Sequence, residues 1–509
     1  MAVAACRPEP PRPLRHPLET ELKLALPPAA LPRLRRHPLF RSAHPVGEPH
    51  WLDNRYFDTP AHRLAAHHVA LRLRLGGGQR LRTVKGSSPS VAGLSRRAEW
   101  EITAPRGVAD AGFADVDDAG IRRLLERHAH HLREVFLTRF RRETRRLEPR
   151  RGVSILLMLD RGRISAQGHN EPICELELEL ERGQPADLFE LASRLAVDLP
   201  LQPEDRSKAD RGYRLAGLTH PEPMPAPRRR RKAADAPAIE AFKASMGAEI
   251  GAWRALLGKD AACDTGEFLH RSRVIQRRLR TLLRLYAPAL PQRFVAEWDR
   301  RLATDARRLG AARELDVLCS TLQEQPSLHR SDAGRRLRQH AQAAREEALA
   351  AALAASGPRR QMSTLLQLQG AMLRLRGGAS AEATAASLVA EGLDALRRRV
   401  RRRLREVDAA AHPGRDPHVL HRLRLAVKDL RNAAVAAAAI GVTTRDPTRI
   451  GALADDLGGL QDIAAARRQL REWANADTRL ASSIADLVAG LEPRHRRLLA
   501  RALRRARQI

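Results

Sequence analysis

Residues 173–181 read Ile-Cys-Glu-Leu-Glu-Leu-Glu-Leu-Glu, with acidic and apolar residues alternating from Glu175 onward. A period of two is typical of a β-strand, with the glutamates on one face and the leucines on the other. Residues 71–75, Leu-Arg-Leu-Arg-Leu, alternate in the same way, and Gly76-Gly77-Gly78 and a further alternating run at 81–84 follow. This arrangement predicts a β-hairpin with a glycine turn.

A Pro- and Arg-rich segment at 219–237 divides the chain. Its closely spaced prolines favour an extended backbone, and the basic run after them cannot be buried. Beyond it the sequence becomes rich in Ala, Leu and Arg at helical spacing, and 509 residues are too many for one ordinary core. We therefore expect a disordered arm over 1–17, a β domain over 18–218, a linker over 219–237 and an all-α domain over 238–509.

The net charge of +32 predicts a polyanionic partner, which could be nucleic acid, an anionic membrane or a phosphate polymer. An aromatic content of 3% disfavours the stacking platforms of single-strand binders. The cysteines are far apart, which is typical of free thiols in a reducing compartment. The longest apolar stretch, 433–442, is about half a membrane span. These features predict a cytoplasmic protein.

Several predicted strands carry charged residues on one face, which for any single strand could simply be its solvent face. The sets are Glu19, Glu21 and Lys23; Arg72 and Arg74; Glu99 and Glu101; Arg139 and Arg141; and Glu175 and Glu177, with Asp160 at the end of an apolar run.

A closed antiparallel barrel with these faces inward would enclose a water-filled lumen. Clustered carboxylates there would need a divalent cation, and all-oxygen ligands favour Mg²⁺ or Mn²⁺. The arginines and lysines would hold a phosphate chain. Metal and phosphate clamps together are what phosphoryl transfer to water requires.

Residues 18–218 also resemble a CYTH domain, of the triphosphate tunnel metalloenzyme family. The motifs that carry the resemblance follow one another in the family's order. They are Glu19-x-Glu21-x-Lys23, Tyr56-Phe57-Asp58-Thr59-Pro60, Leu71-Arg72-Leu73-Arg74, Thr83-Val84-Lys85-Gly86, Glu99-Trp100-Glu101, Arg139-Phe140-Arg141, Asp160, Glu175-Leu176-Glu177-Leu178-Glu179, and Ser207-Lys208 before Arg211-Gly212-Tyr213.

The resemblance implies an antiparallel β-barrel tunnel with two kinds of site residue. The residues implied to grip the triphosphate are Lys23, Arg72, Arg74, Lys85, Arg139, Arg141 and Lys208. Those implied to hold the metal and position the attacking water are Glu19, Glu21, Asp160, Glu175 and Glu177, with Glu101 as a further metal ligand.

The helical half contains an internal repeat. Residues 269–280 and 420–431 align so that one histidine and three basic residues recur at offsets that fall on one stripe of a helix. A solvated face would explain one copy, whereas two copies in register favour an anion-binding groove. The matched residues are His270, Arg273, Arg277 and Arg280, and His421, Arg424, Lys428 and Arg431.

Residues 238–509 resemble a CHAD domain, a conserved-histidine helical domain that is often attached to CYTH. The resemblance implies two duplicated four-helix bundles across a basic cavity, with inorganic polyphosphate as the ligand of the repeated residues. A location at polyphosphate granules within the cytoplasm would follow.

The leading prediction is metal-dependent hydrolysis of inorganic triphosphate, with tripolyphosphate as substrate and with no membrane or specific nucleic-acid partner. One alternative keeps the fold but takes thiamine triphosphate or ATP, the latter with cyclase chemistry. Another is a non-catalytic polyphosphate-binding protein. The sequence leaves the oligomeric state open.

Overall fold

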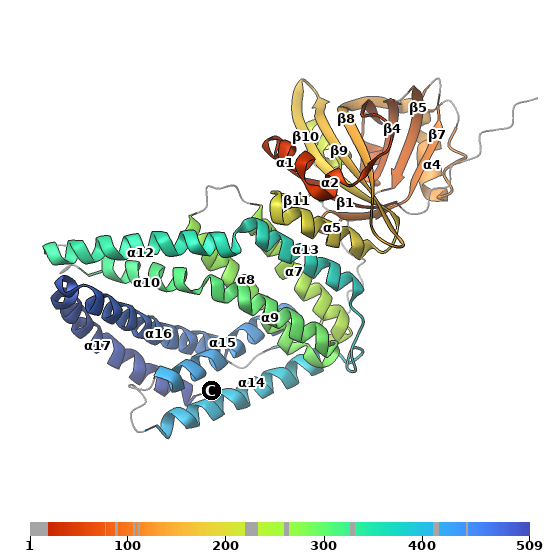
Figure 1. Ribbon diagram of the computed structural model, residues 1–509. Coiled ribbons are helices and arrows are strands. Elements are labelled where there is room, and N and C mark those ends of the chain that lie inside the picture. The colour runs from red at the N-terminus through yellow and green to blue at the C-terminus, as the bar shows by residue number, and fades with distance from the viewer. Residues whose placement is uncertain are drawn as a thin grey trace, which may run out of the picture. The chain divides into compact units, whose positions relative to one another are not determined.

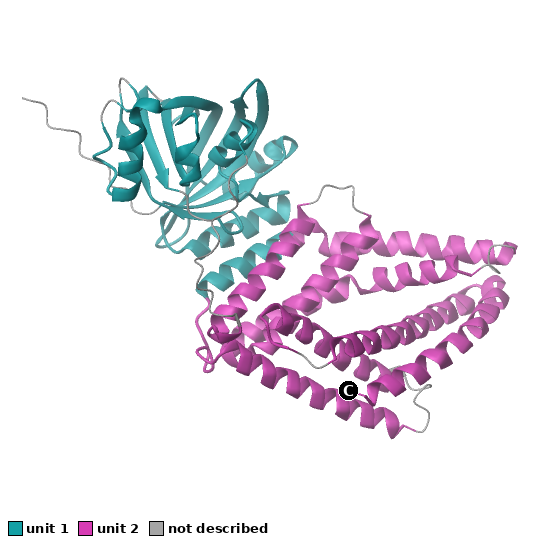
Figure 2. Cartoon of the chain, turned by 180° about the vertical axis from the view of Figure 1, so that it is seen from behind, with its two compact units in different colours: residues 1–228, 362–374 teal, residues 229–361, 375–509 magenta. Residues whose placement is uncertain are grey.

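The structure is a computed structural model, and the residues that it describes are 19–76, 78–86, 90–104, 107–109, 112–218, 233–258, 264–325, 331–410, 417–443 and 446–508. The predicted arm and residues 219–232 of the predicted linker lie outside them. The chain forms two compact units, coloured separately in Figure 2. Unit 1 comprises residues 1–228 and 362–374, and unit 2 comprises residues 229–361 and 375–509.

Unit 1 is built on one sheet with the strand order β11-β1-β10-β9-β8-β3-β4-β5-β7, in which β2 also pairs with β8 and β6 with β1 (Figure 1). The strands are β1 Glu19–Ala25, β2 His44–Pro45, β3 His50–Asp58, β4 Val69–Gly76, β5 Gln79–Gly86, β6 Leu94–Arg97, β7 Glu99–Thr103, β8 Arg133–Arg150, β9 Val153–Ala166, β10 His169–Arg182 and β11 Gln202–Pro203.

The sheet nearly closes on itself. Strand β6 pairs with β1, and β7 pairs with β5 at the other end of the strand order. Only Ala98 separates β6 from β7 in the sequence, so the two ends of the sheet meet there. The predicted antiparallel barrel is confirmed, and so is the hairpin, because β4 and β5 pair from Val69↔Gly86 to Gly76↔Gln79.

Short helices complete unit 1, and the last of them positions a site residue. They are α1 Leu31–Arg36, α2 Pro38–Arg41, α3 Arg63–Ala66, α4 Ala119–His128, α5 Pro185–Asp198 and α6 Lys208–Leu215, together with residues 362–374 of α13 Pro358–Arg374.

Helix α6 begins at a capping box, in which the Ser207 side chain accepts from the backbone N–H of Asp210 and the Asp210 side chain accepts from that of Ser207. A Cβ on Gly212 would collide with the ring of Phe136, so the glycine lets α6 lie directly against β8. Phe136 also stacks on Tyr56 in the buried core at this position. The cap and the close packing together fix Lys208, the first residue of the helix.

Two strands approach each other closely at Gly162 of β9. A Cβ there would collide with the carbonyl oxygen of Arg139 and with Cα of Phe140 on β8. The absence of a side chain therefore allows the local β8–β9 approach in the wall of the barrel.

Unit 2 is all α, as predicted. Its long helices are α7 Ala238–Leu257, α8 Thr265–Leu285, α9 Gln292–Arg308, α10 Gly310–Gln323, α12 Asp332–Ser356, α14 Ala385–Asp408, α15 Pro417–Ala439, α16 Pro447–Ala476 and α17 Ala481–Ala506. The two repeated sequences fall in α8 and α15, and these helices contact each other. The repeat therefore brings its two basic stripes into one region.

Candidate active site

The barrel encloses a cavity of about 530 Å³ whose wall carries both charges. Because side chains alternate along each strand, most of the charged faces seen in the sequence point inward together, the exception being that of Arg139 and Arg141. The predicted site residues that line the cavity are Glu19, Glu21, Lys23, Arg72, Arg74, Lys85, Glu101, Glu177 and Lys208.

Three buried carboxylates form one cluster beside this cavity. Asp160, Glu175 and Glu177 can each offer an oxygen such that all three oxygens lie within 4.8 Å of one another. Strand register explains the arrangement, because Asp160 of β9 lies directly opposite Glu175 of β10, and Glu177 is the next inward residue. The cluster joins Asp160 to two glutamates that lie 15 and 17 positions further along the sequence.

The ammonium group of Lys208 lies among these three carboxylates. Its Nζ is 2.7 Å from Oδ2 of Asp160 and 2.9 Å from Oε1 of Glu177, and it also forms an ion pair with Glu175. Burial alone would lower the pKa of Lys208, but the three carboxylates outweigh it and raise that pKa. Lys208 is therefore charged and supplies part of the positive charge that the cluster needs.

Arg142 supplies a second cation to the cluster. Its Nε and Nη2 donate to the two oxygens of Asp160 at 2.7 and 2.6 Å, and Nη2 also donates to Glu177 at 2.6 Å. Burial raises the pKa of Glu177, yet Lys208 and Arg142 together hold it well below its usual range. For Glu175, burial dominates and the pKa is raised.

The three carboxylates fit a divalent cation. All the donors are oxygen, as Mg²⁺ and Mn²⁺ prefer, and the side chains are buried and all three already contact the Lys208 ammonium group. A metal held by Asp160, Glu175 and Glu177 would take the place that the Lys208 ammonium group has among them. Displaced from the carboxylates, that ammonium group could meet a phosphate oxygen instead.

The remaining cavity charges pair along the walls. Nζ of Lys85 lies 3.0 Å from Oε2 of Glu19 and 2.7 Å from Oε2 of Glu99. Nη2 of Arg72 lies 3.3 Å from Oε1 of Glu99. These contacts place the cations on β4 and β5 against the acids of β1 and β7.

Glu101, a predicted metal ligand, is separate from the cluster. Its Oε2 accepts a hydrogen bond from the Thr83 hydroxyl at 2.8 Å and lies 3.6 Å from Nη1 of Arg74. Burial lowers the pKa of Arg74 to about 10, and the charge of Arg72 acts in the same direction. An anion bound between these arginines would relieve that repulsion.

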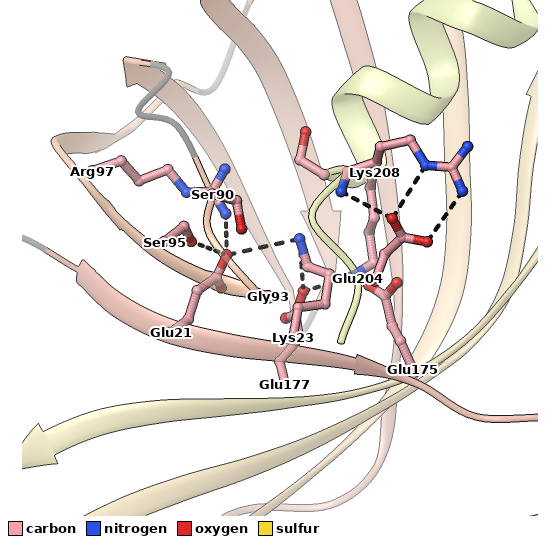
Figure 3. Close-up of polar contacts among 12 residues, drawn as sticks. Glu21, Lys23, Ser90, Gly93, Ser95, Arg97, Glu175, Glu177, Glu204 and Lys208 are labelled. Atoms are coloured by element: carbon pink, nitrogen blue, oxygen red, sulfur yellow. Dashed lines mark hydrogen bonds and ion pairs between the residues drawn. The ribbon is translucent and has the colours of Figure 1, made fainter. Parts of the chain in front are cut away.

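Glu21 is the centre of another group, shown in Figure 3. Its carboxylate accepts from the Ser95 hydroxyl at 3.2 Å and pairs with Arg97. Lys23 lies between Glu21 and Glu177, with its Nζ 3.8 Å from Oε1 of Glu21 and 4.0 Å from Oε1 of Glu177. Lys23 thus links this group to the carboxylate cluster, while Glu19 and Glu21 lie outside the cluster.

Two residues that were predicted to grip the triphosphate lie outside the cavity. Arg139 and Arg141 are exposed and do not line the cavity, whereas Phe140 and Arg142 do. In the run Arg139-Phe140-Arg141-Arg142, basic residues lie on both faces of the strand. The family motif contains Arg139 and Arg141, so the motif alone selected the outward face. Pairing with β9 decides the matter, because Arg142 lies opposite Asp160.

Arg97 and Glu179 also line the cavity, although neither was predicted as a site residue. Burial raises the pKa of Glu179 to about 7, and the neighbouring charges of Glu19 and Glu21 add to the effect. Its place in the acidic stripe of β10 was the available signal. For Arg97 the only signal was its position two residues before Glu99.

In unit 2 the repeated basic residues divide into two kinds. Arg280 donates to Asp299 at 3.0 Å, and Arg431 donates to Asp455 at 2.8 Å. Within the part of unit 2 that the structure describes, no ion pair is formed by the other basic members of the repeat, which are Arg273, Arg277, Arg424 and Lys428.

These unpaired cations repel one another at close range. Burial, followed by the charges of Arg424 and Arg277, lowers the pKa of Lys428 to about 7. Burial and the charge of Arg277 lower the pKa of Arg273 to about 10. We call Arg273, Arg277, Arg424 and Lys428 the helical basic cluster.

The two histidines border the helical basic cluster. Nδ1 of His421 is 2.9 Å from Oε1 of Gln461 on α16, which fixes the orientation of its ring. Burial lowers the pKa of His270, and the charge of Arg313 adds to this effect. A neutral histidine can still donate one hydrogen bond to an anion.

Comparison with protein families locates both domains. A CYTH domain matches residues 17–213, and a CHAD domain matches residues 246–471. The chain therefore consists of a CYTH domain followed by a CHAD domain. The predicted family resemblances are confirmed.

An inorganic triphosphatase of Haemophilus influenzae is 29% identical to this chain over 199 residues, which are 39% of this chain and 54% of that protein. The chain thus spans about half of the length of the curated relative that it matches.

Among solved structures, the CHAD domain from the plant Ricinus communis has 25% identity and a TM-score of 0.41, covering 54% of this chain and 93% of that one. A putative adenylyl cyclase from Hippeastrum, described as having a dominant triphosphatase activity, has 22% identity and a TM-score of 0.30, covering 40% and 98%. No described helix has the length and apolar character needed to span a membrane.

Proposed function

We propose that the CYTH domain hydrolyses inorganic triphosphate with the help of a divalent cation, Mg²⁺ or Mn²⁺, and that the CHAD domain binds inorganic polyphosphate. The observation that carries the first part is the arrangement of the barrel cavity. A buried carboxylate cluster lies beside a wall of arginines and lysines, and a triphosphate needs both a metal and fixed cations.

The cations on β4 and β5 are the proposed clamp for the phosphate chain. Arg72, Arg74 and Lys85 line the cavity from the adjacent strands β4 and β5, and each lies near a glutamate of β7, the strand that pairs with β5. Substrate oxyanions would compete with those glutamates for the same cations. Guanidinium groups suit this task because they bind phosphate oxygens through two parallel hydrogen bonds.

The carboxylate cluster is the proposed reaction centre. A metal bound there would neutralise charge on the phosphate oxygens and activate water. Lys208 and Arg142 would hold the phosphoryl group beside it, because both already point at the cluster. The fixed cations require little reorganisation when negative charge shifts onto the leaving diphosphate.

The aromatic residues of the cavity support an inorganic substrate. Tyr56, Phe140 and Tyr213 line it, but all three are buried in the barrel core. Their rings are occupied by packing against neighbours such as Phe136, so they offer no free face on which a nucleobase or a thiazole ring could stack.

A comparison of substrates tests this part of the proposal. Phosphate release is measured from tripolyphosphate, thiamine triphosphate, ATP and long-chain polyphosphate, each with Mg²⁺, with Mn²⁺ and with EDTA. Preferential, metal-dependent turnover of tripolyphosphate is expected. Preferred turnover of ATP or thiamine triphosphate would reject the substrate, and tight polyphosphate binding without any turnover would indicate a binding protein.

The helical basic cluster supports the second part of the proposal. Half-buried, unpaired and mutually repelling cations gain most from a ligand that carries closely spaced negative charges. The double variant R277Q/K428Q should therefore lose polyphosphate affinity. R293Q/R300Q is the matched control, since it removes the same charge from exposed positions on α9 of the same unit. Equal affinity of the two variants would contradict the assignment.

A further inference from the structure

The outer wall of the barrel carries a second concentration of positive charge, away from the cavity. Arg139 and Arg141 of β8 lie directly opposite Arg163 and Arg161 of β9. All four side chains are exposed, and their inward neighbours are residues such as Phe140 and Asp160. We call these four residues the outer arginine block.

The pairing within the outer arginine block is unfavourable in itself. Directly opposite residues of an antiparallel pair have Cβ atoms about 5 Å apart, so like charges at these positions destabilise the sheet. Along each strand, residues on the same face repeat about every 7 Å. The four arginine side chains therefore start from positions within about 8 Å of one another.

The neighbouring strands barely compensate this charge. On β3, Asp53 forms an ion pair with Arg139, with 3.4 Å between Oδ1 of Asp53 and Nε of Arg139. On β10, the residues opposite Arg161 and Arg163 are Cys174 and Pro172, which bring no carboxylate. In the described part of the barrel, Arg141, Arg161 and Arg163 form no ion pair.

One aromatic side chain borders the block. Trp51 of β3 is 52% exposed, lies opposite Arg141 and has the guanidinium group of Arg139 5.3 Å from its ring centre. A cation over an indole face is held in a preferred orientation. Because the ring is already engaged by Arg139, it does not provide the successive stacking faces that a single-stranded nucleic acid uses.

We propose that the outer arginine block binds a segment of an inorganic polyphosphate chain on the outside of the barrel, at a site separate from the cavity. Guanidinium groups pair with phosphate oxygens in fixed geometry, and a thin, unbranched chain can follow two rows of arginines. Specific nucleic-acid interfaces bury about 600 Å² or more of protein surface, whereas the outer arginine block consists of four side chains. The choice of polyphosphate over other polyanions rests on the proposed function.

The test uses the full chain, with R277Q/K428Q in every protein to weaken the helical basic cluster. Into this background we would introduce R141Q/R163Q, or R127Q/R151Q as the control. The control residues are exposed arginines of the same unit, so both changes remove the same charge. Binding of long-chain inorganic polyphosphate and of single-stranded RNA is measured over a range of salt concentrations, alongside tripolyphosphate turnover and thermal unfolding.

R141Q/R163Q should weaken polyphosphate binding by about tenfold. The fall of log affinity with log salt should also become less steep, by about two units of slope. Turnover of tripolyphosphate should stay unchanged, and the melting temperature should stay equal or rise, because two like-charged pairs are relieved. The control should change affinity less than about twofold.

Equal effects of R141Q/R163Q and the control on affinity would overturn the proposal. A fall in the melting temperature would also overturn it, since that would mark the arginines as structural. A larger loss for single-stranded RNA than for polyphosphate would replace the proposed ligand with nucleic acid. Absence of tripolyphosphate turnover in every protein would reject the catalytic proposal alone, because polyphosphate binding is measured separately.

Discussion

Nζ of Lys208 lies 2.7 Å from Oδ2 of Asp160, and the same ammonium group pairs with Glu175 and Glu177. One lysine at the start of α6 thus contacts three carboxylates from β9 and β10. This contact connects the cap of a short helix to the proposed reaction centre.

The variant K208M should make folding depend on a metal. Removing one partner from a buried ion pair costs about 3–5 kcal/mol, because the remaining charges stay buried without compensation. A divalent cation bound to the three carboxylates would restore that compensation. The melting temperature of K208M should be lower than that of the wild type and should rise more on addition of Mn²⁺.

K85M is the control for this experiment, because Lys85 pairs with Glu19 and Glu99 rather than with the cluster. Its melting temperature should respond to Mn²⁺ as the wild type does. An equal response of K208M and K85M would argue against a metal at Asp160, Glu175 and Glu177.

Arg142 and its neighbour Arg141 form a matched pair on opposite faces of β8. R142A should lower kcat/KM for tripolyphosphate by roughly 10- to 100-fold, because it removes charge-assisted hydrogen bonds worth about 1.5–3 kcal/mol each. R141A should leave kcat/KM unchanged. Steady-state kinetics of both variants measure this, and a larger effect of R141A would mean that the inward face of β8 is misassigned.

Polyphosphate binding by the helical domain should weaken as the pH rises. The pKa of Lys428 is lowered to about 7, so this side chain loses its charge as the pH rises through that value. A bound anion favours the charged form and moves the transition to a higher pH. Polyphosphate affinity should therefore fall by roughly fivefold between about pH 6 and pH 9.

Two variants separate Lys428 from the histidines at the same site. K428R keeps its charge throughout and should show a much flatter pH dependence, whereas K428Q should bind weakly at every pH. A wild-type pH dependence in K428R would assign the titration to another group, with His421 and His270 as the neighbours to examine.

Gly162 should be essential for the wall of the barrel. G162A places a Cβ against the backbone of β8, which cannot move aside without breaking strand pairing, so a loss of about 1–3 kcal/mol in the free energy of unfolding is expected. G247A is the control, because a Cβ on that helical glycine meets no atom within 4 Å. G247A should raise the free energy of unfolding slightly. Chemical denaturation measures both, and equal stabilities would contradict the close β8–β9 approach.

Local alternation predicted much of the barrel from the sequence. The β4–β5 hairpin and the inward positions of Arg72, Arg74, Glu175 and Glu177 follow directly from a period of two, because side chains of a strand alternate between its faces.

Alternation along a single strand does not predict which strands pair or in which register. Consecutive basic residues at 141 and 142 satisfy either face, and only the register with Asp160 selects Arg142. The sequence likewise gave no sign that residues 362–374 belong to unit 1, where Arg374 donates to Asp187 at 2.6 Å. That segment has the same Leu-rich helical pattern as the rest of the helical half, so composition could not distinguish it.

The central claim is that the carboxylate cluster supports metal-dependent hydrolysis of tripolyphosphate. The most direct measurement is phosphate release from tripolyphosphate by the wild type, by E175A/E177A and by E181Q as Mn²⁺ or Mg²⁺ is titrated. Glu181 extends the same acidic stripe but pairs with Arg146 outside the cluster. We predict metal-dependent turnover for the wild type and E181Q, and a loss of at least about 100-fold for the folded double variant. Turnover by E175A/E177A at the wild-type rate, or full activity of the wild type in EDTA, would contradict the claim.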